Sequence, residues 1–98
     1  MLLGGHGNIS VTANVAPRLM HDLCVAAIEG NAKRAVAVHM RLLPMHRQLF
    51  CEPSPAPTKW AMAQLGLCGA AVRLPIVPLS PAGQTLVAQA LRDSGLKS

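Results

Sequence analysis

The sequence has very few aromatic residues and few acidic ones. Its 98 residues include one Trp, one Phe and no Tyr, and four Asp and Glu stand against nine Lys and Arg. A core with so few rings has to be built from Ala, Val and Leu. The formal net charge of +5 could indicate nucleic-acid binding. However, the basic residues are dispersed and no aromatic residues lie between them, so the pattern predicts no nucleic-acid partner.

A disulfide framework is also absent from the pattern. Cys24, Cys51 and Cys68 are odd in number and widely spaced, and no C-x-x-C pair occurs. Such cysteines are typical of reduced thiols in a cytosolic protein. Residues 1–3 lack the basic region and the apolar run of a secretion signal, which again predicts a cytoplasmic protein.

Long hydrophobic runs are missing as well. The most apolar stretch, residues 65–79, is interrupted by Arg73, Pro75 and Pro78. A membrane-spanning helix needs about 20 predominantly apolar residues, so no membrane association is expected. Half of the residues (51%) are nevertheless apolar. An apolar excess in so short a chain is typical of a part whose surface belongs to an internal interface.

The first seventeen residues predict a glycine turn, a short strand and the start of a helix. Gly4, Gly5 and Gly7 allow a tight turn with close backbone approach to a ligand or a neighbour. Residues 8–12 alternate apolar and polar side chains and are the only convincing strand. Nothing later in the chain pairs with this strand, so the pattern indicates the closing piece of a larger βα protein.

Four helices are predicted after this strand. The first covers residues 16–29 and ends at Gly30, and Asn31 is the N-cap of the second, which continues from residue 32 towards residue 50. Pro44 should kink the second helix. A third helix is expected over residues 58–65, and Ser80 caps a last helix that ends at Gly95. The fold class is therefore mainly α.

Four histidines raise the question of a metal site. His39 and His46 are predicted to lie on the buried side of the second helix, two turns apart, which is about 10 Å along the axis. That separation is too large for a shared zinc ion, and no carboxylate or thiol lies at ligand spacing. No metal and no cofactor are predicted, and core or interface histidines are the preferred interpretation.

Four blocks of sequence cover nearly the whole chain: GGHGNISVTANV at residues 4–15, RLLP at 41–44, FCEPSPAPTKWA at 50–61, and LGL at 65–67 with RLP at 73–75 and PL at 78–79. In composition and order these blocks resemble the 4-hydroxy-tetrahydrodipicolinate synthase (dihydrodipicolinate synthase) family of class I pyruvate aldolases. N-acetylneuraminate lyases share the family's fold but look different in the first and third blocks.

The resemblance implies a (β/α)8 barrel followed by a C-terminal helical domain. Residues 1–30 would be the last βα unit of the barrel, and residues 31–98 the helical domain. Family members condense pyruvate, held as a Schiff base on a lysine, with aspartate semialdehyde on the route to diaminopimelate and lysine. They assemble as homo-oligomers, dimers or tetramers.

The family's catalytic residues do not match positions in this chain. The Schiff-base lysine and the proton-relay tyrosine belong to earlier parts of the family sequence, and this chain has no Tyr. Among the site residues only Ile9 matches, whose main chain lies against bound pyruvate in the family. The expectation is a C-terminal fragment that is inactive alone. Another pyruvate aldolase of the N-acetylneuraminate lyase type, or a free-standing helical interaction module, are the alternatives.

Overall fold

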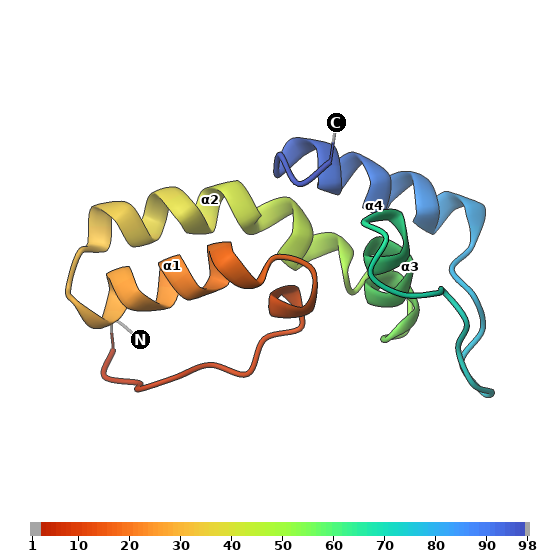
Figure 1. Cartoon of the computed structure of the whole chain (residues 1–98), viewed down its shortest axis with the longest axis horizontal. Coiled ribbons are helices and arrows are strands. Elements are labelled where there is room, and N and C mark those ends of the chain that lie inside the picture. Colours follow the sequence, from red (N-terminus) through yellow and green to blue (C-terminus); the bar gives the residue numbers. More distant parts are fainter. Residues whose placement is uncertain (1–2, 98) are drawn as a thin grey trace.

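The computed structural model describes residues 3–97. It contains a short 3-10 helix, η1 (Thr12–Asn14), and four α-helices: α1 (Pro17–Ile28), α2 (Ala32–Gln48), α3 (Ala56–Gln64) and α4 (Pro81–Asp93). In Figure 1, α1 and α2 lie side by side, the N-terminal segment runs along the far side of α1, and α3 and α4 gather around the end of α2. The mainly α fold class is confirmed.

The predicted strand over residues 8–12 is wrong for this chain. Residues 5–10 have no regular secondary structure, and Thr12 already belongs to η1. A strand exists only when a neighbour accepts and donates its backbone hydrogen bonds. Within residues 3–97 no strand is available to do so, and the segment is therefore an extended, exposed arm.

The helix boundaries follow the capping residues closely. The Asn31 side chain accepts a hydrogen bond from the Arg34 backbone N–H, and the Ser80 side chain accepts one from Gly83. These contacts satisfy backbone donors that the first turn of a helix leaves unpaired. Gly30 follows α1 with φ of +79°, the left-handed conformation that suits glycine at a helix end. The very short turn between α1 and α2 follows from this pair of signals.

Helix α2 connects the two parts of the molecule. It continues through Pro44, and its last turns are inclined towards α3 in Figure 1. The main core lies between α2, α3 and α4, and includes Met45, Leu49, Val87 and Leu91. Against α1, by contrast, α2 makes only small clusters, one of which consists of Ala26, Ala27 and Ala35. Phe50 follows the end of the helix and is exposed.

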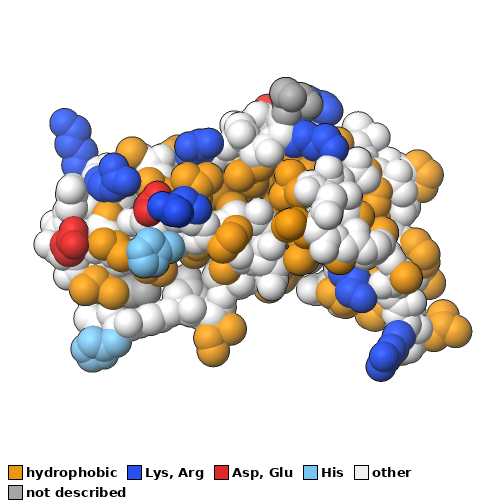
Figure 2. Space-filling view, viewed as in Figure 1, with side chains coloured by type: hydrophobic (Ala, Val, Ile, Leu, Met, Phe, Trp, Pro, Cys, Tyr) orange, Lys and Arg blue, Asp and Glu red, His pale blue; other side chains and the backbone are white. Residues whose placement is uncertain are grey.

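The molecule is more open than a closed domain of its length. Its radius of gyration is 14.1 Å, against the ~13 Å typical of 100 residues. Figure 2 shows apolar side chains spread over the visible face, including the region of α1 and the arm. Ile28 and Val36 are among the exposed large apolar residues on the α1–α2 pair. Burial of apolar surface is therefore incomplete around α1 in this chain.

Hydrogen bonds at both ends hold α4 in place. Glu52 accepts hydrogen bonds from the backbone N–H of Ser80 (3.1 Å) and from its hydroxyl. At the other end of α4, Nε of Arg41 donates to the Ser94 carbonyl at 2.9 Å. The two Ser80 contacts lower the pKa of the Glu52 carboxyl, and they outweigh the opposing effect of burial. These hydrogen bonds fix both ends of α4 relative to α2 and to the loop that precedes α3.

Gly83 offers a test of the close packing around the Glu52–Ser80 contact. A Cβ at this position would lie 2.6 Å from Cδ1 of Leu79 and would also collide with the Glu52 carboxylate. Leu79 is buried and has little room to move. Overpacking of this kind costs about 1–3 kcal/mol. We expect Gly83→Ala to lower the free energy of unfolding by that amount in urea titrations followed by circular dichroism.

The matched control for this variant is Gly69→Ala. No atom lies within 4 Å of a Cβ at position 69, and the change in stability should stay within about 1 kcal/mol. A Gly83→Ala variant as stable as the original chain, or more so, would contradict the close packing described for the start of α4.

Candidate functional site

The arm places the backbone of Ile9 in the open. Residues 3–9 are all exposed, and the Ile9 side chain is fully so. Among the described residues, Gly5 to Ile9 form no backbone hydrogen bonds. The Ile9 side chain is therefore not part of a hydrophobic core among the described residues. Its main-chain groups are free to bind another molecule or another strand.

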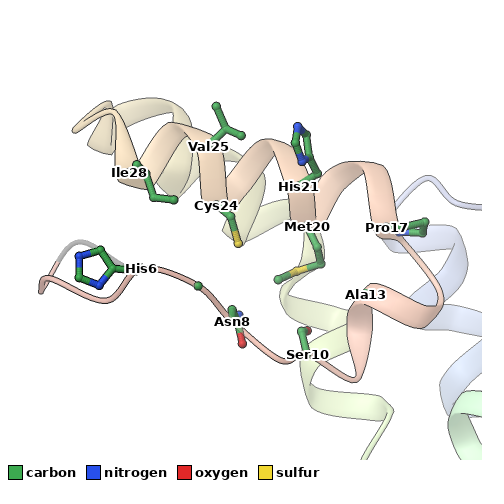
Figure 3. Close-up of a pocket in the computed structure, with 11 residues that line it drawn as sticks. His6, Asn8, Ser10, Ala13, Pro17, Met20, His21, Cys24, Val25 and Ile28 are labelled. Atoms are coloured by element: carbon green, nitrogen blue, oxygen red, sulfur yellow. The ribbon is translucent and has the colours of Figure 1, made fainter.

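A cleft of about 450 Å³ separates the arm from α1. In Figure 3, the side chains of Met20 and Cys24 point from α1 towards Asn8 and Ser10, while His21 and Val25 point away from the arm. Met20, Cys24 and Ile28 are spaced four residues apart, so they lie on one side of the helix. The cleft is lined by His6, Gly7, Asn8, Ser10, Ala13, Pro17, Met20, His21, Cys24, Val25 and Ile28.

A second cleft, of about 580 Å³, opens on the α2 side of α1. Asn8 lines both clefts, and so marks the edge between them. The other residues of the second cleft are Leu3, Leu23, Ala27, Ala35, Val36 and His39. Both hollows are mostly apolar, so α1 has apolar flanks that neither α2 nor the arm fills. Such flanks are typical of a surface that packs on further protein.

The turn after the arm is firmly held. Thr12 is 2% exposed, and its Oγ1 lies 2.8 Å from Nδ1 of His46 in a hydrogen bond between η1 and α2. The Thr12 carbonyl accepts from the backbone N–H groups of Val15 and Ala16. Val15 is buried in the main core. The base of the arm is therefore fixed although the arm itself is free.

The two histidines of α2 are closer than their spacing along the helix suggests. The rings of His39 and His46 stack with centroids 5.4 Å apart, because the two side chains lean towards each other. His39 is exposed rather than buried, and His46 is half-buried. Within residues 3–97 no group of three or more His, Cys, Asp or Glu residues is placed to hold a metal ion. Burial and the charge of neighbouring His39 lower the pKa of His46.

The three lysines are dispersed over the surface. Nζ of Lys59 donates to the Ala71 carbonyl at 2.9 Å, and Nζ of Lys97 donates to the Gln64 carbonyl at 2.6 Å. Lys33 is exposed in the first turn of α2. None of them lines the clefts beside α1.

Sequence reasoning missed the roles of Arg41, Glu52 and His46. All three lie in or beside the blocks at residues 41–44 and 50–61, which carried the family resemblance. Their partners Ser94, Ser80 and Thr12 are 28 to 53 residues away in the sequence. The residue types could have marked these three positions as polar contacts, but nothing in the sequence indicated which residues would be their hydrogen-bond partners.

A family model described as the dihydrodipicolinate synthetase family matches residues 1–94. The chain is 67% identical over 96 residues to the 4-hydroxy-tetrahydrodipicolinate synthase of Methylibium petroleiphilum, covering 98% of this chain and 33% of that protein. It is 58% identical to the synthase of Albidiferax ferrireducens, again covering 98% of this chain and 32% of the relative. The chain thus spans about a third of the length of the relatives it matches.

Solved structures give the same result. The dihydrodipicolinate synthase of Acinetobacter baumannii, complexed with pyruvate, matches with a TM-score of 0.94 at 41% identity, over 98% of this chain and 33% of that one. The enzyme of Thermotoga maritima matches with a TM-score of 0.91 at 40% identity, over 96% and 32%. The helices and the unpaired arm are therefore those of one part of a (β/α)8-barrel enzyme.

The chain belongs to the dihydrodipicolinate synthetase family. The family resemblance is confirmed, as is the expectation that the chain matches a part of such an enzyme rather than the whole. No helix within the described residues is long and apolar enough to cross a membrane.

The lowered pKa of His46 predicts a pH dependence of stability. In the unfolded chain His46 takes up a proton near its ordinary pKa of 6.5, but the folded chain resists protonation down to a lower pH. The contribution of His46 to stability is therefore complete above pH 6.5 and is lost as the pH falls through the folded pKa. We expect the free energy of unfolding to be lower at about pH 5.5 than at about pH 7.5.

The variant His46→Asn should reduce this difference, and His6→Asn, at an exposed position, should leave it unchanged. The measurement is urea unfolding at both pH values for the three proteins. An equal pH dependence in the original chain and in His46→Asn would show that another group is responsible.

Proposed function

We propose that this chain is the C-terminal part of a 4-hydroxy-tetrahydrodipicolinate synthase, a lyase that condenses pyruvate with aspartate semialdehyde through a lysine Schiff base. In this proposal residues 1–30 supply the last βα unit of the barrel, and residues 31–98 form the helical domain. The observation that carries the proposal is the unpaired arm beside the uncovered flanks of α1, in a chain that superposes on a pyruvate-bound synthase. A neighbouring strand and helix would cover these surfaces.

The contribution of this chain to the reaction would be made by backbone rather than by side chains. Ile9 would place its main chain against the pyruvate, at the end of the last barrel strand, where barrel enzymes gather their active-site groups. No catalytic residue is assigned to this chain. A Schiff-base lysine must be neutral near pH 7, which requires burial or a nearby cation, and Lys59 is instead engaged with a backbone carbonyl at the surface.

The proposed partners are therefore pyruvate and aspartate semialdehyde, bound by a whole barrel that contains this part. A homo-oligomer, dimer or tetramer, is proposed for that whole enzyme. One structural relative is described as a monomeric dihydrodipicolinate synthase variant, so the oligomeric state has to be measured. A cytoplasmic location is consistent with the free cysteines Cys24, Cys51 and Cys68.

The alternatives are less well supported. The two relatives reported above, at 67% and 58% identity, are synthases rather than N-acetylneuraminate lyases. A free-standing helical module would have to bury the flanks of α1 in some other way.

The first test uses borohydride trapping with pyruvate, which makes a Schiff base permanent. The isolated chain should give no stoichiometric adduct by intact mass, because none of its lysines has the required setting. A hybrid enzyme, in which this chain replaces the matching third of the Methylibium petroleiphilum protein, should give one adduct per subunit. The adduct should lie on a lysine of the Methylibium part.

A stoichiometric adduct on Lys59 of the isolated chain would contradict the proposal and indicate a separate aldolase site. A folded hybrid enzyme without any adduct would contradict it as well. Activity of the hybrid enzyme with aspartate semialdehyde would show that this chain can complete a synthase, and a folded hybrid enzyme without that activity would favour the lyase alternative.

The second test concerns Ile9. Proline at this position removes the backbone N–H and fixes φ, whereas valine keeps the backbone and changes only the side chain. In the hybrid enzyme we expect Ile9→Pro to raise KM for pyruvate by at least about tenfold, a loss of ~1.4 kcal/mol of binding free energy. Ile9→Val should stay within about twofold. Equal effects of the two variants would show that the main chain of Ile9 is not the binding group.

A further inference from the structure

The hydrogen bond between Thr12 and His46 joins the arm to the helical part of the chain. Thr12 Oγ1 and His46 Nδ1 are 2.8 Å apart, and the residues are 34 positions apart in the sequence. Within residues 3–97 it is the only side-chain hydrogen bond that links residues 3–16 to the helices beyond α1. The Thr12 side chain is almost completely buried, so water cannot replace His46 as a partner there.

The position of Thr12 makes this bond relevant to Ile9. They are three positions apart in the sequence, which is at most about 11 Å of extended chain. Between them, Ser10 and Val11 start the η1 turn: their carbonyls accept from the backbone N–H groups of Ala13 (3.3 Å) and Asn14 (3.1 Å). A displacement of Thr12 would therefore be passed through a short hydrogen-bonded turn to the Ile9 backbone.

His46 is itself held in one orientation. Its ring stacks on that of His39 at 5.4 Å with an interplanar angle of 28°. It projects from α2 next to Met45, which is fully buried in the main core. The helical part thus presents a fixed ring nitrogen to the base of a free arm.

We propose that His46 is a positioning residue: through Thr12 it fixes the backbone that carries Ile9 to the pyruvate. The inference rests on the proposed function. It gives the helical part a role in substrate binding through the backbone of Ile9 rather than through direct contact. Since the Ile9 backbone would bind pyruvate in the ground state and the transition state alike, loss of the hydrogen bond should affect KM more than kcat.

The test compares two pairs of variants in the hybrid enzyme. His46→Phe fills the same space and can stack on His39 but has no ring nitrogen, whereas His46→Asn places an amide near the former Nδ1. Thr12→Val removes the hydroxyl at nearly constant shape, and Thr12→Ser keeps it. His39→Phe is the control for the stack alone.

We expect His46→Phe and Thr12→Val each to raise KM for pyruvate about five- to tenfold with kcat within about twofold, the signature of lost uniform binding. His46→Asn, Thr12→Ser and His39→Phe should stay near the KM of the unaltered hybrid enzyme. Circular dichroism checks that each variant is folded. Using both partners of the bond keeps the test decisive if one variant fails to fold.

The isolated chain gives an independent readout by nitrogen-15 relaxation. His46→Phe and Thr12→Val should lower the order parameters of Ser10 and Val11 and leave those of α4 unchanged. An active hybrid enzyme whose KM is unchanged in His46→Phe and Thr12→Val would overturn the positioning role alone. A folded, unaltered hybrid enzyme that fails to trap pyruvate would contradict the proposed function, and the inference with it.

Discussion

The positions of the arm and of α1 depend on how the turn at residues 12–15 is anchored. Val15 is buried among Met45, Leu49 and Val87, so the turn is part of the main core rather than a loop on its surface. The Thr12–His46 hydrogen bond fixes the same turn laterally. From this one point the arm leaves in one direction and α1 in the other. Both are exposed on a side that the chain itself does not cover.

Helix α2 connects this anchored turn to the rest of the molecule. Its first half packs on α1 mainly through alanines, which allow close approach but bury little apolar area. Its second half contributes Met45 and Leu49 to the core shared with α3 and α4. The Glu52–Ser80 and Arg41–Ser94 contacts then fix α4 against it. The main core of the helical part therefore lies within the described residues, whereas α1 and the arm leave apolar flanks uncovered there.

The sequence predicted those features that depend on neighbouring residues. The caps at Asn31 and Ser80 and the stop at Gly30 act within one turn of a helix, so their positions could be predicted from residue type and spacing. The strand over residues 8–12 failed for the opposite reason. Its alternation was correct for a strand, but a strand also depends on a partner that residues 3–97 do not contain.

The candidate site was less predictable than the helices. Ile9 could be singled out only through the family resemblance, because an exposed aliphatic residue carries no chemical signal of its own. His46 was weighed as a metal ligand with His39, and its contact with Thr12 was not foreseen because the two lie 34 residues apart. Spacing along the helix also overestimated the His39–His46 distance, since both rings lean together. Such contacts can be found only from the three-dimensional structure.

The central claim is that residues 4–10 are an extended arm in the isolated chain and become a paired strand only when further protein supplies the neighbouring strands. Amide hydrogen exchange of these residues, compared between the isolated chain and the hybrid enzyme, tests it most directly. The isolated chain should exchange there at close to the unprotected rate, and the hybrid enzyme at least about a hundredfold more slowly. Equal protection in the two proteins, whether fast in both or slow in a monomer of the isolated chain, would contradict the account.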